Sequence, residues 1–172
     1  GMADSIQSDD FSMKLAEFSS RTVDNINNVL KEKKLSSLVT ITNPLDINPA
    51  ADDDAHARIT QFLTKDDGVD AVVVSLDPLS PAMKTLDGGE IQAYDMNDPS
   101  SIKNSLIQIA GESRTPIVAV VDGGRLYEPI RDALIKNDIP VFNVCDKAIA
   151  ALSIYIQGRI HSEAIRSSEG FA

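Results

Sequence analysis

The stretch Val69–Leu76, with the sequence Val-Asp-Ala-Val-Val-Val-Ser-Leu, is the clearest strand in this chain. Branched side chains fit a pleated sheet, and an almost unbroken run of valines indicates burial on both faces of the strand. Strands of this kind are typical of a parallel sheet that is covered by helices. The stretch therefore predicts an α/β protein with a parallel sheet.

Three other segments have strand character. Residues 38–43 (Leu-Val-Thr-Ile-Thr-Asn) form an aliphatic and β-branched run that ends before Pro44, and the residue before a proline avoids helical backbone angles. Residues 116–121 (Pro-Ile-Val-Ala-Val-Val) and 140–145 (Pro-Val-Phe-Asn-Val-Cys) follow the same pattern. The sequence therefore predicts four short, buried strands.

Segments with helical spacing of apolar residues alternate with these strands. Their predicted inward faces are Val23, Ile26, Val29 and Leu30; Ala55, Ile59, Phe62 and Leu63; Ile102, Leu106, Ile109 and Ala110; Tyr127, Ile130, Leu134 and Ile135; and Ile149, Leu152, Ile156 and Ile160. Crossovers of about a dozen residues or more between consecutive strands require parallel pairing. We therefore predict a flavodoxin-like three-layer α/β/α sandwich with a mainly parallel sheet.

Acidic residues mark the predicted helix starts. Asp98 followed by Pro99 indicates an N-cap with proline at the first helical position, and Asp146 is the predicted cap of the last helix. The triplet Asp52–Asp54 has two interpretations, a helix start or a cluster of metal ligands. Calcium loops place ligands at alternating positions and need a glycine at the sharp turn, which is missing here. The helix start is favoured.

The organisation follows from these periodicities. Residues 1–19 are predicted to be a disordered or loosely packed leader, because residues 1–10 are polar and acidic. Residues 20–161 are predicted to form the flavodoxin-like domain. Residues 162–172 lack a sustained period and are predicted to be a frayed tail.

The composition of the chain excludes several classes of function. A length of 172 residues suits one domain with its own core, and a net charge of −10 argues against a nucleic-acid or anionic-membrane surface. The chain has no apolar window long enough for a spanning helix and no signal-peptide pattern, so a cytoplasmic location is expected. One cysteine, Cys145, excludes an internal disulfide and any multi-cysteine metal site, and a structural role is favoured for it.

Polar turns follow all four predicted strands, and the carboxyl ends of parallel strands lie along one edge of a sheet. Ligands bind at that edge, where helix amino-termini also present unpaired N–H groups. The candidate substrate-facing or interdomain residues are Asn43, Pro44, Asp46, Asp77, Pro78, Ser80, Asp122, Gly123 and Gly124, and the turn Cys145–Asp146 completes the edge. The competing interpretation is that Asn, Asp, Gly and Pro are what turns require.

Signatures of catalysis are missing from the sequence. A Walker loop, a dinucleotide-binding glycine motif and a nucleophile elbow are absent, and Gly88-Gly89 is weak evidence for a phosphate loop. A phospho-accepting receiver domain needs an acidic pair after its first strand, where this chain has Asn43-Pro44. Neither His56, predicted on a surface helix, nor His161 has a partner base or a ligand at metal spacing, so both are expected to be solvated. We therefore predict no catalytic residue and no metal site.

The order of six segments resembles the third domain of the ADP-forming acyl-CoA synthetases, which are relatives of succinyl-CoA ligase. The segments are Asn43–Asp46, Asp70–Val74, Thr115–Val120, Gly123-Gly124, Ile139–Phe142 and Lys147–Leu152. The resemblance covers roughly residues 20 to 160. It implies the flavodoxin-like ligase domain of that family.

The resemblance also implies partners. The complete enzyme of that family joins a CoA-binding Rossmann domain, this type of domain twice and an ATP-grasp unit, and it forms acyl-CoA through an acyl phosphate and a phosphohistidine. This chain would then be an accessory ligase domain that docks with the CoA-binding and ATP-grasp domains. It would bind no cofactor alone, since CoA and ATP or ADP with Mg belong to the complete enzyme, and the isolated chain would be inactive. The phosphohistidine lies on the other ligase domain, and neither His56 nor His161 matches it.

Two segments would face that active site. The turn Asn43–Asp46 would lie across a domain interface from the acyl and phosphohistidine region, with Asp46 as an orienting or capping acid. Ser80–Leu86 matches a helix that aims its amino-terminus at the phosphohistidine in the relatives. The loop Asp77–Pro81 carries prolines where the relatives have glycines, which removes N–H donors.

A second hypothesis comes from another class of function. It is a free-standing flavodoxin-like binding or regulatory module for a small anionic ligand, without catalysis. The sequence leaves open the acyl substrate, the formation of a homodimer and whether the chain is part of a longer enzyme.

Overall fold

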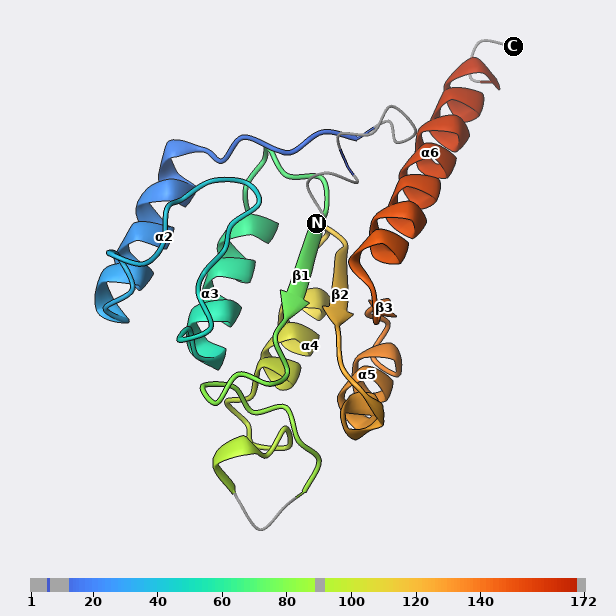
Figure 1. Cartoon of the computed structure of the whole chain (residues 1–172). Coiled ribbons are helices and arrows are strands. Elements are labelled where there is room, and N and C mark those ends of the chain that lie inside the picture. Colours follow the sequence, from blue (N-terminus) through green and yellow to red (C-terminus); the bar gives the residue numbers. More distant parts are fainter. Residues whose placement is uncertain (1–5, 7–12, 89–91, 170–172) are drawn as a thin grey trace.

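A parallel sheet of three strands lies at the centre of the computed structural model, which describes residues 6, 13–88 and 92–169 (Figure 1). The strands are β1 (Val72–Leu76), β2 (Ile117–Val121) and β3 (Val141–Phe142), in the order β1-β2-β3. Val72 is opposite Ile117, and Ala119 is opposite Val141. The predicted α/β class, with a flavodoxin-like fold and a parallel sheet, is confirmed.

Helices precede and follow each strand, as the periodicity predicted. They are α2 (Ser20–Glu32), α3 (Asp53–Thr64), α4 (Ile102–Glu112), α5 (Glu128–Ile135) and α6 (Cys145–Glu169), with short 3-10 helices η1 (Gln92–Tyr94) and η2 (Arg125–Tyr127). Helices α3, α4 and α5 pack on one face of the sheet, and α6 packs on the other. Helix α2 packs against α3 (Figure 1).

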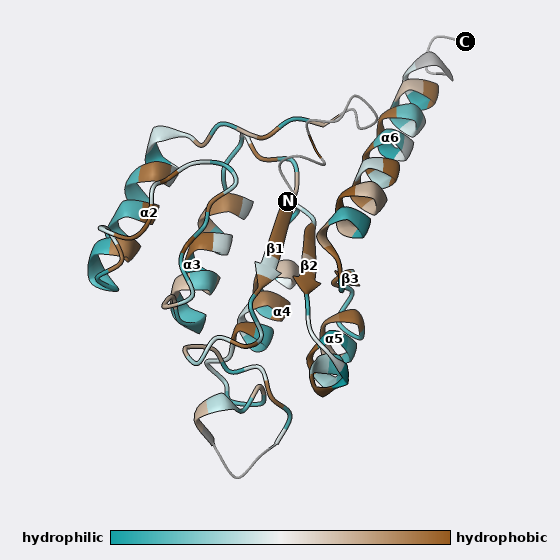
Figure 2. Cartoon of the chain, viewed as in Figure 1, coloured by the Kyte–Doolittle hydropathy of each residue, from teal (hydrophilic) through white to brown (hydrophobic). Residues whose placement is uncertain are grey.

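The face under α4 and α5 holds the main core. Its buried side chains include Val72, Val74, Leu76, Ile117, Ala119, Val121, Ile102, Leu106, Ile130 and Leu134. All five residues of β2 are buried, whereas in β1 Val73 is half-buried and Ser75 is exposed. The prediction that both faces are buried is therefore confirmed for β2. For β1 it is wrong for the face that carries Val73 and Ser75. Figure 2 shows both strands as mostly hydrophobic, so the difference comes from what covers them.

The predicted strand at residues 38–43 is wrong. This segment is irregular, and Val39 is buried in the cluster between α2 and α3. The N–H groups of Leu38 and Val39 donate to the carbonyl of Leu35, so the start of the segment is held in a turn after α2. The branched side chains that predicted a strand are used to pack the chain against two helices. The peptide bond between Asn43 and Pro44 is cis.

Strand and helix ends also differ in detail. The predicted strand 140–145 is shorter, because α6 already begins at Cys145 and places Asp146 in its first turn instead of at the cap. The N-cap of α4 is Ser101, whose Oγ accepts from the N–H of Asn104, so the prediction of Asp98 is wrong. The predicted helix start at the acidic triplet is confirmed, since Asp52 Oδ1 accepts the N–H of Ala55 at 2.9 Å.

Helix α6 continues through most of the segment that the sequence predicted to fray. It extends to Glu169, and an ion pair of 3.2 Å between Arg159 and Glu163, four residues apart, supports its exposed part. Ile160, predicted to face inward, is 59% exposed because the helix extends past the sheet (Figure 1). Among the described helices, none combines the length and apolar character needed to cross a membrane.

The described part of the leader is packed. Met13 joins the cluster under α6, and Phe18 joins the clusters on the other side of the sheet. Residues 13–18 therefore connect the α6 side to the α2 and α3 side (Figure 1). The rest of the predicted leader apart from Ile6, the end of the predicted tail at 170–172, and Gly89 of the Gly88-Gly89 pair lie outside the described residues.

Candidate functional site

Two of the predicted turns meet at the carboxyl end of the sheet. The turn Asp77–Ser80 follows β1, and the turn Asp122–Gly124 follows β2. They are in contact, because a Cβ placed on Gly123 would lie 3.3 Å from Cγ of Pro78. The structure thus brings these two turns together, and we call this surface the carboxyl edge.

The polar groups of the first turn stabilise the loop itself. Asp77 Oδ1 accepts the N–H of Leu79 at 3.0 Å, and the carbonyl of Pro78 accepts the hydroxyl of Thr85 at 2.9 Å. Ser80 is buried, and its hydroxyl donates to the carbonyl of Pro49 at 2.8 Å. Ser80 is therefore a loop anchor that is not available to a ligand.

The second turn is held by a residue that the sequence analysis missed. Arg131 of α5 donates from Nη1 to the carbonyls of Val121 and Gly123, and from Nη2 to that of Gly124, each at 3.1 Å. The ring of Tyr127 lies against Gly123, where a Cβ would be 2.6 Å from Cδ2 of the tyrosine. A glycine is required there by this close approach. No local sequence signal connects Arg131 to a turn seven residues earlier.

Apolar side chains are exposed along the same edge. Leu79, Leu126 and Val144 follow β1, β2 and β3, and they are 76%, 65% and 42% exposed. The carboxylates of Asp77 and Asp122 are exposed beside them. The carboxyl edge therefore presents isolated aliphatic side chains and negative charge on turns whose backbone is fixed.

The helix that the family resemblance implied at Ser80–Leu86 is not present. These residues form turns, and the buried carboxylate of Asp53 accepts the backbone N–H groups of Lys84 at 3.1 Å and of Ile102 at 2.6 Å. Burial raises the pKa of Asp53, and these two N–H groups oppose the rise. Because Asp53 takes the N–H of Lys84, this segment offers no helix amino-terminus to a phosphate.

The turn Asn43–Asp46 is not at the end of a strand. Asn43 Nδ2 donates to the carbonyl of Ala16 at 3.0 Å, and Asp46 Oδ1 accepts the N–H of Asn48 at 3.0 Å. Asp46 is thus a capping acid within its own loop. Asn43 and Pro44 line a groove beside β1, whereas Asp46 is exposed.

This β1 groove has a volume of about 910 Å³. It is lined by residues of β1 and of the chain leading into it, by α3, by α6 and by residues 6, 13–16, 18, 43–45, 47, 114 and 116. The lining includes Ala71, Val73, Ser75, Ile59, Leu63, Leu152 and Ile156. The sequence pattern predicts another strand at residues 38–43 and therefore gives no sign of this groove.

His56 of α3 lines the groove and is half-buried, so the expectation of a solvated histidine is wrong. Burial lowers the pKa of His56, while the carbonyl of Asp52 and the carboxylates of Asp53, Asp52 and Asp77 oppose the shift. Its Nδ1 lies 3.0 Å from the carbonyl of Asp52, which fits a neutral ring that carries its proton on Nδ1. Among the described residues, no group of three or more side chains is arranged to hold a metal ion.

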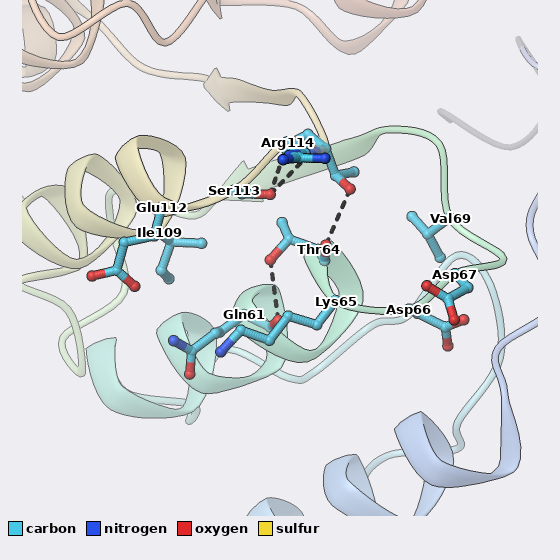
Figure 3. Close-up of a pocket in the computed structure, with 11 residues that line it drawn as sticks. Gln61, Thr64, Lys65, Asp66, Asp67, Val69, Ile109, Glu112, Ser113 and Arg114 are labelled. Carbon is cyan, nitrogen blue, oxygen red and sulfur yellow. Dashed lines mark hydrogen bonds between the residues drawn. The ribbon is translucent and has the colours of Figure 1, made fainter.

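A second cavity, of about 510 Å³, lies between the carboxyl ends of α3 and α4 (Figure 3). Its lining contains Lys65 and Arg114 together with the acids Asp66, Asp67 and Glu112. The hydroxyl of Thr115 donates to the carbonyl of Thr64 at 3.0 Å, which joins the segment before β2 to the end of α3.

Asp66 in this lining is a structural residue. It accepts the N–H groups of Ser19 at 2.9 Å and Gly68 at 3.0 Å. Burial favours a raised pKa for Asp66, but hydrogen bonds from Thr22, Gly68 and Ser19 lower it to about 2. This carboxylate ties the start of α2 to the loop before β1.

Comparison with known protein families and with curated proteins finds no match to this chain. Among solved structures, the fold is similar to PH0766 from Pyrococcus horikoshii OT3, with a TM-score of 0.65 and 19% sequence identity. The similarity covers 87% of this chain and 30% of the other, so this chain spans less than a third of the protein it matches. At this identity the match supports the fold alone.

Proposed function

We propose that this chain is an accessory ligase domain of an ADP-forming acyl-CoA synthetase. It would work in the cytoplasm by docking with CoA-binding and ATP-grasp domains, which would hold CoA and ATP or ADP with Mg. The observation that carries the proposal is the carboxyl edge, where Leu79, Leu126 and Val144 are exposed on rigid turns. Neither of the two cavities described above is lined by these residues.

Further support comes from the order of motifs and from the fold match. The turns Asn43–Asp46 and Gly123-Gly124 occur in the order expected for the third domain of that family. The solved chain of similar fold is more than three times as long as the part that this chain covers, since the match spans 30% of it. A domain with this fold therefore occurs within a larger protein.

In the proposed role, the chain contributes a surface and no reacting group. Exposed aliphatic side chains stabilise a docked domain by leaving water, and fixed turns lose little conformational entropy on docking. Asp77 and Asp122 would favour a basic patch on the partner. The hydrogen bonds of Asp46 and Ser80 within their loops fit residues that shape an interface.

The alternative role, a module for a small anionic ligand, has less support. The carboxyl edge presents the carboxylates of Asp77 and Asp122, which would repel an anion. The cavity of Figure 3 has three acidic side chains, Asp66, Asp67 and Glu112, against Lys65 and Arg114. Neither surface is suited to anion binding.

The test is reconstitution with separately produced CoA-binding, ATP-grasp and phosphohistidine-bearing ligase polypeptides from the same genome. We expect acyl-CoA to form from acetate, CoA and ATP when this chain is present. We expect Leu79→Asp combined with Leu126→Asp to weaken assembly about tenfold or more, because buried charge opposes docking. Ile135→Asp is the matched control, since Ile135 is 54% exposed at the far end of α5.

Titration calorimetry of the chain alone with CoA, ATP and acetyl phosphate should show no tight binding. Turnover of acyl-CoA by the isolated chain would contradict the proposal. So would an assembled enzyme whose rate does not depend on this chain.

A further inference from the structure

The outer edge of β1 has unpaired backbone groups. In a parallel sheet the N–H and C=O of one residue point to the same side, and the next residue points to the other. The N–H of Val72 donates to the carbonyl of Pro116 at 3.0 Å, so Val72, Val74 and Leu76 face β2. Within the described part of the chain, nothing pairs with the outward groups of Ala71, Val73 and Ser75.

The β1 groove lies beside this edge, because Ala71, Val73 and Ser75 are among its lining residues. Ile59 and Leu63 of α3 line one side, and Leu152 and Ile156 of α6 line the other. These helices cover opposite faces of the sheet, so the space between them lies level with β1. Residues 13–18 pass from the α6 side to the α3 side (Figure 1), and residues 13–16 and 18 contribute to the lining of the groove.

The residues that line the groove favour an occupant with particular side chains. Alternate side chains of an extended segment would contact the apolar residues of α3 and of α6 in turn. Arg159 and Glu163 in the lining pair with each other at 3.2 Å. Lys14 and Arg114 also line the groove, and neither forms an ion pair with a described residue. The lining has one carboxylate that likewise forms no ion pair with a described residue, that of Asp70. An acidic residue in the occupant is therefore favoured.

We propose that the β1 groove binds an extended segment of a different polypeptide, which adds as a strand to the free edge of β1. The segment would have alternating apolar side chains and an acidic residue. A second copy does not suit the groove, because its own β1 edge is recessed in the same way and its β2 lies between two strands. This inference does not depend on the proposed enzyme, since the groove and the carboxyl edge are different surfaces.

The experiment uses the full chain and a capped nine-residue peptide of alternating valine and threonine with one aspartate. We expect the amides of Val73 and Ser75 to exchange rapidly in the free chain and to slow about tenfold or more with about 1 mM peptide. The amide of Val72 is the internal control, because it is already bonded to Pro116. Methylation of alternate peptide nitrogens removes the donors that face β1 and should weaken binding about tenfold.

A variant of the chain provides the second arm. Val73→Pro removes an outward N–H without removing a bond to β2, and it should abolish peptide binding in a chain that still folds. Leu79→Ser at the carboxyl edge should bind the peptide normally. The inference is overturned if the peptide produces no protection, or if methylation has no effect. It is also overturned if the free chain protects these amides through residues 38–43 or through a dimer seen by sedimentation.

Discussion

The carboxyl edge of the sheet differs from the outer edge of β1, which we call the side edge. The two differ in which groups, side chains or backbone, have no partner among the described residues. At the carboxyl edge, Arg131 and Asp77 use their side chains to bond the turn backbone, and the residues left exposed are Leu79 and Leu126. At the side edge, the side chains of the groove are largely apolar, and the outward backbone groups of β1 have no partner among the described residues.

The difference indicates two kinds of recognition. A surface with satisfied backbone and exposed aliphatic residues suits a preformed domain, whose own surface brings complementary side chains. An edge with free N–H and C=O groups suits an extended segment, whose backbone supplies the missing bonds. We therefore propose a docking face at the end of this small sheet and a pairing edge at its side.

The largest expected effect compares the two sides of β1 by proline substitution. Val72→Pro removes the bond to Pro116 and should cost about 3 kcal/mol or more of unfolding free energy. Val73→Pro removes an N–H that has no partner among the described residues, so its cost should be at least about 2 kcal/mol smaller. Urea unfolding of both variants measures the difference. Equal costs would mean that the side edge is paired in solution.

A smaller effect is expected from adjacent glycines at the carboxyl edge. Gly123→Ala places a Cβ 2.6 Å from the ring of Tyr127 and should destabilise the chain by about 1–3 kcal/mol. The matched variant Gly124→Ala meets nothing within 4 Å and should stay within about 0.5 kcal/mol of the parent. Thermal unfolding separates the two. A neutral Gly123→Ala would show that the turn is not held as rigidly as described.

The smallest effect concerns the pH dependence of stability through His56 in the groove. Burial lowers its pKa in the folded chain below the ordinary value of 6.5, so the unfolded chain binds the proton more readily. Stability from this group is therefore complete above the unfolded pKa and decreases as pH falls from 6.5 toward the folded pKa. His56→Gln should reduce this acid sensitivity while changing stability at pH 8 by about 1 kcal/mol or less.

The control for this prediction is His161→Gln on the exposed part of α6, which should change the unfolding free energy at pH 8 by less than about 0.5 kcal/mol. The measurement is the urea midpoint at a series of pH values. A profile for His56→Gln that parallels the parent would contradict the buried position of this ring.

Sequence reasoning predicted most of the helices and the strands β1 and β2, because their apolar spacing is a local property. The prediction was wrong at residues 38–43, because branched residues suit a strand and a loop packed on helices equally well. It was also wrong at Ser80–Leu86, because the carboxylate of Asp53, 31 residues before Lys84, accepts the backbone N–H of Lys84. In the candidate site, sequence reasoning predicted that the turns after β1 and β2 meet. It could not predict Arg131 or the β1 groove.

The sequence by itself determined the α/β class, the parallel order of strand and helix, and the polar turns at the strand ends, because periodicity and turn chemistry act over a few residues. Tertiary structure alone decided that Val39 packs between α2 and α3 and that the outer edge of β1 pairs with no other described strand. Strand pairing and burial depend on which segments remote in sequence come together, so a valine run predicts a strand without specifying its neighbours.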